Sequence, residues 1–138
     1  DDALRSTLQA AQAFTSGRVI TVFGCGGNRD QGKRKTMGLV ATEESGFTIV
    51  TSDNPRKENP QYIINDILEG IPPYLSQGKD YEVIVDREEA IRFAIHLAGP
   101  GDLVLIAGKG HENYQILKAG AVDFDDKDVA TKIMKGML

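Results

Sequence analysis

The sequence predicts an α/β fold of the Rossmann-like, doubly wound kind, with a mostly parallel sheet and a short antiparallel hairpin at one edge. Three observations lead to this prediction. Short segments rich in β-branched residues alternate with segments of helical periodicity, and polar or glycine-rich stretches follow the strand-like segments. The length of 138 residues, with 41% hydrophobic and 26% charged residues, suits one globular domain spanning residues 1–138. Alternation of this type favours parallel strands joined by right-handed crossovers.

The first half of the chain contains three expected helices and two expected strands. Leu4, Leu8, Ala11 and Phe14 recur at helical spacing, with Asp1 or Asp2 before them as an N-cap. The first strand, RVITVFG, is rich in β-branched residues. The expected elements are a helix over 3–14, a strand over 18–24, a helix over 33–45, a strand over 47–53 and a helix over 61–70.

The second half continues the alternation and then changes character. The segment YEVIVD reads as a strand, REEAIRFAIHLA as a helix and DLVLIAG as a strand. Gly120 separates two short segments that suit a hairpin at a sheet edge. The expected elements are a strand over 81–86, a helix over 87–98, a strand over 102–108, hairpin strands over 115–119 and 121–124, and a helix over 126–137.

Three polar stretches follow expected strands: GCGGNRDQGKRK over 24–35, SDNPRKENP over 52–60 and GKGHENYQ over 108–115. In doubly wound sheets, ligands bind beyond the carboxyl ends of the strands. We therefore expect these stretches to meet at one rim. Their mixture of several cations with a few acids suits a small zwitterion or a phosphate.

The stretch over 24–35 nearly matches two phosphate-binding patterns and satisfies neither. From Gly27 it reads G-x-x-x-x-G-K, but Arg34 stands where a P-loop requires Ser or Thr. From Gly24 it begins G-x-G, but Arg29 stands where the dinucleotide motif requires a third glycine. A tight turn remains an equal explanation of the glycines. Lys33 and Arg34 open a helix, where cations oppose the macrodipole, which favours an anion nearby.

The tetrapeptide Asp53-Asn54-Pro55-Arg56 is the sharpest local signal. Pro55 fixes its own φ and restricts Asn54 to extended geometry, so the turn is stiff. A stiff turn presents Arg56 well for a bidentate hydrogen bond to a carboxylate, and Glu112 in a neighbouring loop could meet an ammonium group. An α-amino acid head group is a reasonable ligand; an ordinary Asx-Pro turn with a solvated arginine is the alternative.

Composition argues against several other classes of protein. The net charge of −4 includes no dominant basic stripe, which disfavours nucleic-acid binding. The single cysteine, Cys25, fits a reducing cytoplasm and reads as a small packed residue. No apolar run has the roughly 20 residues that span a bilayer, no zinc-ligand spacing occurs, and no signal peptide begins the chain. Because the chain begins at Asp1 without Met, we expect a fragment of a longer protein.

Three long motifs, FGCGGNRDQGKR, TSDNPR followed by INDILEG, and GKGHENYQ, resemble the C-terminal domain of the Mur ligases that make UDP-N-acetylmuramoyl-tripeptide. The resemblance covers essentially the whole chain, and DDAL at the start is similar to the end of the family's Y-A-H-T-P-D-A-L segment. It implies an α/β domain that binds an amino acid. The N-terminal UDP-sugar domain and the central ATP-binding domain would lie outside this chain.

The resemblance also implies site residues. Arg56 and Asn54 would bind the distal carboxylate of meso-diaminopimelate, with Arg29 assisting. Its distal ammonium group would be bound by Asp53, Glu112 and the Gly108 carbonyl. Lys33 and Arg34 would lean toward ATP phosphates or an acyl-phosphate, and Asp2 would lie near the nucleotide. No residue of this chain is assigned a catalytic or metal-binding role.

The implied activity is ATP-dependent amide-bond formation in peptidoglycan precursor synthesis, in the cytoplasm. Partners would be meso-diaminopimelate, UDP-MurNAc-L-Ala-D-Glu and ATP, with Mg²⁺ and ATP held mainly by the central domain; no nucleic-acid or membrane partner is expected. We expect the chain to be inactive alone. An L-lysine-adding homologue and a stand-alone amino-acid or nucleotide-binding module are the alternatives, the former disfavoured because lysine offers Arg56 no distal carboxylate.

Overall fold

The structure is a computed structural model that describes residues 2–27, 31–108, 114–117, 120–123 and 125–136. Its helices are α1 (Asp2–Phe14), α2 (Gly32–Glu44), α3 (Pro60–Leu68), α4 (Arg87–Leu97) and α5 (Asp126–Met134). Its strands are β1 (Val19–Phe23), β2 (Phe47–Val50), β3 (Tyr81–Val83), β4 (Leu103–Ile106), β5 (Tyr114–Leu117) and β6 (Gly120–Asp123). Each helix and strand expected from the sequence is present.

Four strands form one parallel sheet in the order β3-β2-β1-β4. Ile20 of β1 pairs with Phe47 of β2 on one side and with Val104 of β4 on the other. The chain thus runs from β1 through β2 to β3 at one edge of the sheet, and β4 then pairs with the opposite side of β1. This reversal between β1 and β4 is the switch point of a doubly wound sheet, where such folds bind ligands.

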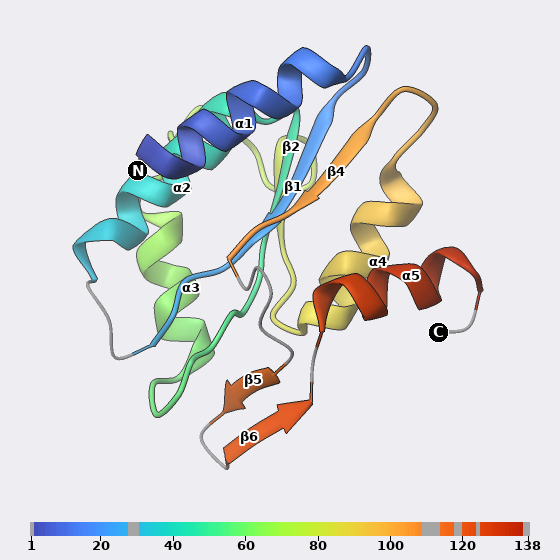
Figure 1. Ribbon diagram of the computed structural model, residues 1–138. Coiled ribbons are helices and arrows are strands. Elements are labelled where there is room, and N and C mark those ends of the chain that lie inside the picture. The colour runs from blue at the N-terminus through green and yellow to red at the C-terminus, as the bar shows by residue number, and fades with distance from the viewer. Residues whose placement is uncertain (1, 28–30, 109–113, 118–119, 124, 137–138) are drawn as a thin grey trace.

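Helices cover both faces of the sheet (Figure 1). On the face of α1, α2 and α3, Val19 and Phe23 of β1 belong to one apolar cluster. On the face of α4 and α5, the alternating residues Ile20 and Val22 belong to a second cluster. Alternate strand side chains point to opposite faces, and β1 is buried throughout because helices cover both of them. Full burial of one such apolar side chain stabilises the fold by about 1.5–3 kcal/mol.

Helices α3, α4 and α5 each begin at a side-chain cap. The carboxylate of Asp86 accepts a hydrogen bond from the Glu89 N–H at the start of α4, and that of Asp125 accepts one from the Asp128 N–H at the start of α5. Asn59 accepts from the Gln61 N–H at the start of α3. These caps pair donors that the first helical turn leaves without intrahelical partners. They explain why sequence patterns located these helix starts within one residue.

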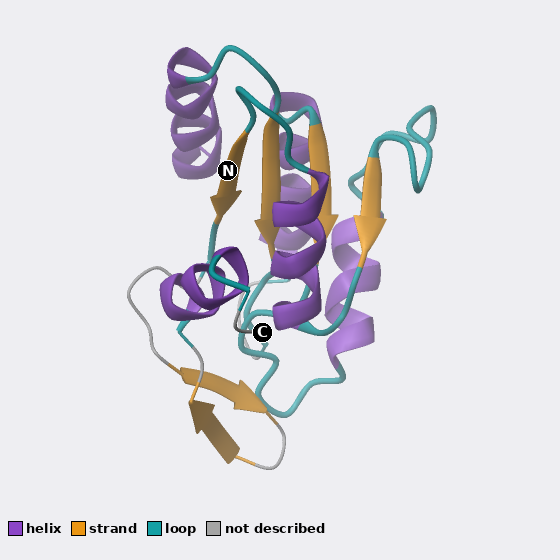
Figure 2. Ribbon diagram, turned by 90° about the vertical axis from the view of Figure 1, so that its right-hand side faces the viewer, coloured by secondary structure: helices purple, strands orange, loops and turns teal. Residues whose placement is uncertain are grey.

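The expected hairpin forms, but its predicted position at an edge of the main sheet is wrong. β5 and β6 pair antiparallel with each other and make a separate two-stranded sheet. Figure 2 shows the four parallel arrows pointing toward the end of the molecule where this hairpin lies. The chain leaves β4 at its carboxyl end and returns as α5, which packs against α4, so β5 and β6 extend past the sheet instead of along β4.

The four strands of the main sheet are shorter than their apolar patterns predicted, and β2 and β3 lose residues only at their carboxyl ends. β2 ends at Val50 and β3 ends at Val83, each three residues before the expected end. The following backbone leaves the ladder to enter the loops at the carboxyl rim, where the hydroxyl of Thr51 donates to the Val85 carbonyl at 3.2 Å. No helix in the described part of the chain is long and apolar enough to cross a membrane.

Candidate functional site

The loops that follow β1, β2 and β4 meet at the carboxyl end of the sheet. The Gly27 N–H donates to the Asn54 carbonyl at 2.7 Å, which joins the loop after β1 to the loop after β2. The Ala107 N–H donates to the Val22 carbonyl at 2.8 Å and so holds the start of the loop after β4 beside β1. The parallel topology therefore brings together three segments that are distant in the sequence, as their positions after the strands predicted.

Gly27 allows two of these loops to touch. A Cβ atom at Gly27 would lie 1.8 Å from the Pro55 carbonyl oxygen, and one at Gly24 would lie 2.4 Å from that of Thr51. Both distances are too short for any side chain. The glycines at these two positions serve close packing against the loop after β2, which neither the P-loop comparison nor the tight-turn explanation anticipated.

Gly108 occupies the switch point itself. Its φ of +113° lies in a region that side-chain-bearing residues rarely adopt. A Cβ there would lie 3.4 Å from the Gly24 carbonyl oxygen and 3.7 Å from the Asp53 Oδ2. Gly108, after β4, and Asp53, after β2, therefore lie close together at the carboxyl end of β1, the strand between them.

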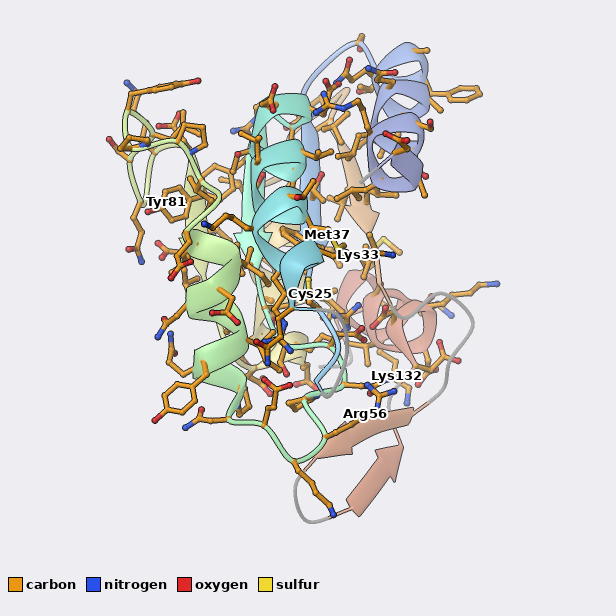
Figure 3. The ribbon with its side chains drawn as sticks, turned by 90° about the vertical axis from the view of Figure 1, so that its left-hand side faces the viewer. Cys25, Lys33, Met37, Arg56, Tyr81 and Lys132 are labelled. Atoms are coloured by element: carbon orange, nitrogen blue, oxygen red, sulfur yellow. The ribbon has the colours of Figure 1, made fainter. Side chains whose placement is uncertain are left out.

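A groove opens where the three loops meet. It consists of two overlapping hollows of about 340 and 480 Å³. Residues lining one or both of them are Gly24, Cys25, Gly26, Lys33, Met37, Asp53, Asn54, Arg56 and Gly108. Figure 3 shows Lys33 and Met37 on α2, Cys25 below them, and Arg56 farther toward the hairpin. A groove of this size can hold a small molecule.

Arg56 has the most unusual backbone of the site. Among the described residues it is the only non-glycine with positive φ, at +56°. Its Nη1 donates to the carbonyls of Gly27 and Asn54, each at 3.2 Å, so it is anchored to both loops. Within the described part of the chain, its Nε and Nη2 groups make no hydrogen bond. Strain of this kind costs on the order of 1 kcal/mol and is found preferentially at functional sites.

The charges around the groove are of both signs. Among the lining residues, Asp53 and the neutral Asn54 are buried, Arg56 is half-buried and Lys33 is exposed. Lys33 makes no ion pair with any residue that the structure describes. Five predicted site residues (Lys33, Asp53, Asn54, Arg56 and Gly108) are thus brought together around one groove.

Arg34 lies elsewhere, contrary to the expectation that it would lean toward a phosphate. Its guanidinium is buried and donates to Glu58 Oε1 and Oε2 at 2.9 and 3.1 Å and to Asp66 Oδ2 at 2.8 Å. It also donates to the Gly26 carbonyl at 3.2 Å. Burial acts to lower the pKa of Arg34, but the hydrogen bonds to Glu58 and Asp66 outweigh burial and raise it. Carboxylates of this chain therefore neutralise this cation at the start of α2.

Of the other predicted residues, only Asp2 is described by the structure. Asp2 is exposed in the first turn of α1 and does not line either hollow. Arg29 and Glu112 lie outside the described residues, so their assignment to the site stays a prediction.

Cys25 is a packed residue, as the sequence suggested. Its thiol is buried and lies 3.6 Å from the Met37 sulfur. Burial raises the pKa of Cys25 from 9.0 to about 12; Arg34 acts in the opposite direction, whereas Asp53 also raises it. The thiol is therefore protonated at neutral pH and is a poor nucleophile. Cys25 and Met37 give one end of the groove an apolar wall.

A buried ion pair below the groove was not anticipated from the sequence. Arg87, the first residue of α4, pairs with Asp126, the first residue of α5. The two residues are 39 positions apart, and each sits beside an N-capping aspartate in a pattern that reads as an ordinary helix start. No signal in one sequence links them.

No group of three or more His, Cys, Asp or Glu side chains that could hold a metal ion occurs among the described residues.

Comparison with known proteins gives a consistent result. The family described as "Mur ligase, glutamate ligase domain" matches residues 1–110. The chain is 51% identical over 135 residues to the UDP-N-acetylmuramoyl-L-alanyl-D-glutamate–2,6-diaminopimelate ligase of Syntrophomonas wolfei. It is 49% identical over 136 residues to the ligase of the same name from Clostridioides difficile. These matches cover 98% and 99% of this chain, and 27% and 28% of the relatives.

A solved structure of a ligase with that name has the same fold, with a TM-score of 0.90 and 41% sequence identity. The match covers 98% of this chain and 27% of the solved chain. This chain therefore spans about a quarter of the length of the relatives it matches.

Proposed function

This chain belongs to the Mur ligase family, and from that premise we propose that it is the amino-acid-binding domain of an ATP-dependent ligase that adds meso-diaminopimelate to UDP-MurNAc-L-Ala-D-Glu. The observation that carries the proposal is the convergence of Asp53, Asn54, Arg56 and Gly108 around one groove at the switch point. The names of the relatives at about 50% identity support the same substrates.

The groove suits a zwitterion with a second carboxylate. In the proposed complex, Arg56 donates from Nε and Nη2 to the distal carboxylate, a charge-assisted and bidentate arrangement. Asn54 contacts the same carboxylate, and Arg29 assists. Asp53, Glu112 and the Gly108 carbonyl receive the distal ammonium group. A Cβ at Gly108 would lie only 3.7 Å from Asp53 Oδ2, so these two residues are close enough for one ammonium group to contact both.

In the proposed reaction, ATP phosphorylates the γ-carboxylate of the D-glutamyl residue. The free amine of diaminopimelate then attacks the acyl carbon, phosphate leaves, and an amide forms. The contribution of this domain is to hold the amine in line and to exclude water. Positioning of two reactants can contribute up to about 7–11 kcal/mol to lowering the barrier. In the proposed complex, Lys33, which is exposed and lines the groove, approaches a phosphate group of the second substrate.

ATP and Mg²⁺ are proposed to bind mainly to a part of the ligase outside this chain. The stretch over 24–35 lacks the Ser or Thr of a P-loop, and the described residues lack a carboxylate cluster. Alone, the chain is accordingly proposed to form no amide. The activity belongs to the assembly of peptidoglycan precursors, which we place in the cytoplasm.

The test is an NMR titration of the chain with meso-diaminopimelate and, separately, with L-lysine. We expect diaminopimelate to shift the amide signals of Asp53, Asn54, Arg56 and Gly108. Lysine, which lacks the distal carboxylate, should bind more weakly. Arg56→Ala should weaken diaminopimelate binding by about 10- to 100-fold, because it removes charge-assisted hydrogen bonds.

Lys57→Ala is the matched control, because Lys57 is a cation in the same loop but does not line the groove. It should leave the affinity unchanged. An equal response to lysine, or an equal effect of both alanine variants, would contradict the role of Arg56. The absence of any response would contradict a binding site formed by this chain alone.

A further inference from the structure

Arg87 is buried beneath the groove and does not line it. Its side chain is fully buried and that of its partner Asp126 is 8% exposed. Its Nη1 donates to the Ser52 carbonyl at 2.9 Å, and its Nη2 donates to the Ala107 carbonyl at 3.2 Å. Ser52 immediately precedes Asp53, and Ala107 immediately precedes Gly108. One guanidinium thus holds the backbone of both loops just before each reaches the proposed amino-acid site.

The remaining donors of Arg87 bind Asp126 in a fork. The Nε donates to Oδ1 at 2.7 Å and the Nη2 to Oδ2 at 2.8 Å. Bidentate pairing fixes the plane of the guanidinium as well as its position. That fixed plane aims the outer N–H groups at the two carbonyls. A lysine keeps the positive charge but has no planar fork, so it cannot bind all of these acceptors in the same directions.

The same side chain also fixes both ends of the segment that connects β4 to α5. Ala107 follows β4, and Asp126 begins α5; the segment between them contains the β5–β6 hairpin and Glu112. Because the Nη2 of Arg87 donates to both the Ala107 carbonyl and Asp126, one nitrogen atom binds the two ends of this segment.

We propose that Arg87, held by Asp126, is a positioning residue for amino-acid binding: it sets the relative placement of the Asp53-Asn54-Pro55-Arg56 turn and Gly108. This inference rests on the proposed function for the identity of the ligand. A buried pair is not needed for stability as such, since apolar residues can often replace one without loss. What an apolar replacement cannot supply is a set of donors directed at two loops.

The test compares Arg87→Lys and Asp126→Asn with Ile91→Ala. Ile91 is a fully buried residue of the same helix, α4, in the apolar cluster, and has no part in the hydrogen-bond network. Each variant of the chain is titrated with meso-diaminopimelate by NMR, and its Tm and amide hydrogen exchange are measured without ligand. We expect Arg87→Lys and Asp126→Asn each to lower the affinity by at least about tenfold, because misplacement of binding groups weakens positioning.

Without ligand, the amides of Asp53, Asn54 and Gly108 should exchange faster in both network variants. In Ile91→Ala, the exchange rates of these amides and the affinity for diaminopimelate should be unchanged, even if this variant loses as much Tm as the network variants or more. The double variant should bind diaminopimelate no more weakly than either single variant, because both changes break the same hydrogen-bond network. The proposal would be overturned if amide exchange in the loops were unchanged in Arg87→Lys and Asp126→Asn. It would also be overturned if Ile91→Ala accelerated that exchange equally.

The two proposals fail in different ways. If the unaltered chain does not bind diaminopimelate, the proposed function of the isolated chain fails, while the exchange data still decide whether Arg87 positions the loops. If the unaltered chain binds and the network variants bind equally well, the positioning role fails and the proposed function stands. Should Arg87→Lys not fold, Asp126→Asn carries the same comparison.

Discussion

The guanidinium of Arg34 is held by carboxylates from two separate segments, Glu58 before α3 and Asp66 within it. The arginine is almost completely buried, whereas Glu58 and Asp66 are 23% and 39% exposed. The pair is therefore asymmetric: removal of the arginine leaves carboxylates that water can reach, but removal of the carboxylates leaves a buried cation. Through its hydrogen bond to the Gly26 carbonyl, Arg34 also ties the glycine loop to α3.

Arg34→Ala should destabilise the chain by about 3 kcal/mol, the lower end of what loss of one partner of a buried ion pair costs, because the remaining carboxylates reach water. Urea unfolding followed by circular dichroism measures this. Lys35→Ala is the matched control, since its ion pair with Glu69 is 3.9 Å long and 64% exposed on both sides. It should change the free energy of unfolding by less than about 0.5 kcal/mol. Equal effects of the two changes would contradict a structural role for Arg34.

At the scale of elements, the site depends on how closely the loops after β1 and β2 approach each other. The strands bring their carboxyl ends to one rim, but strand pairing stops at Phe23 and Val50. Beyond that point, the contact between the loops is maintained by the hydrogen bond from Gly27 to Asn54 and by the lack of a side chain at Gly27. Arg56 then bonds to carbonyls of both loops.

Gly27→Ala should separate these loops. The new Cβ would lie 1.8 Å from the Pro55 carbonyl oxygen, so the backbone must move. We expect a loss of stability of about 1–3 kcal/mol, typical of overpacking, together with shifts of the Asn54 and Arg56 amide signals. Urea unfolding and NMR spectra of the variant measure the two effects.

Gly99→Ala provides the comparison, because the nearest atom to a Cβ there, Asp102 Oδ2, is 3.9 Å away. That change should alter stability by no more than about 0.5 kcal/mol. If Gly27→Ala were as well tolerated as Gly99→Ala, the close approach of the loops would not be what the glycine provides.

At the scale of the whole molecule, two apolar clusters on opposite faces of the sheet hold the layers together. Cys25 belongs to the cluster beneath α1, α2 and α3 and is the only cysteine of the chain. Its thiol thus reports whether this cluster is closed.

Cys25 should react with a thiol reagent at pH 8 at least about 1,000-fold more slowly in the folded chain than in urea, because its thiol is buried and its raised pKa leaves far less of the reactive thiolate. The measurement is the labelling rate with iodoacetamide. A rate in the folded chain close to that in urea would show that the thiol is accessible, contrary to its burial.

Stability should also fall at alkaline pH. Burial raises the pKa of Cys25 from 9.0 to about 12, so between these values the unfolded chain loses a proton that the folded chain retains. The contribution is fully present below pH 9 and is lost as the pH rises toward 12, by up to about 1.4 kcal/mol per pH unit. Cys25→Ala should remove this part of the pH dependence in urea unfolding, and an unchanged alkaline slope would contradict the assignment.

Much of this molecule follows from local sequence. The periodicity of Leu4, Leu8 and Ala11 and the β-branched run in β1 identify a helix and a strand, and the alternation of such elements predicts a parallel sheet. The loops that follow parallel strands must share a rim, so Arg56 and Gly108 could be predicted to meet there. These inferences succeed because residues close together in the sequence set the periodicity of helices and strands, and because the alternation of strands with helices indicates parallel strands.

The tertiary structure alone decided where side chains find partners distant in the chain. It assigned Arg34 to Glu58 and Asp66 and removed it from the expected phosphate contact; it joined Arg87 to Asp126 across 39 positions; and it placed the hairpin beyond the sheet instead of at its edge. An arginine at a helix start reads the same in sequence whether it faces solvent, a ligand or a buried carboxylate. Only packing determines which of these it meets, because burial makes an unpaired charge too costly to keep.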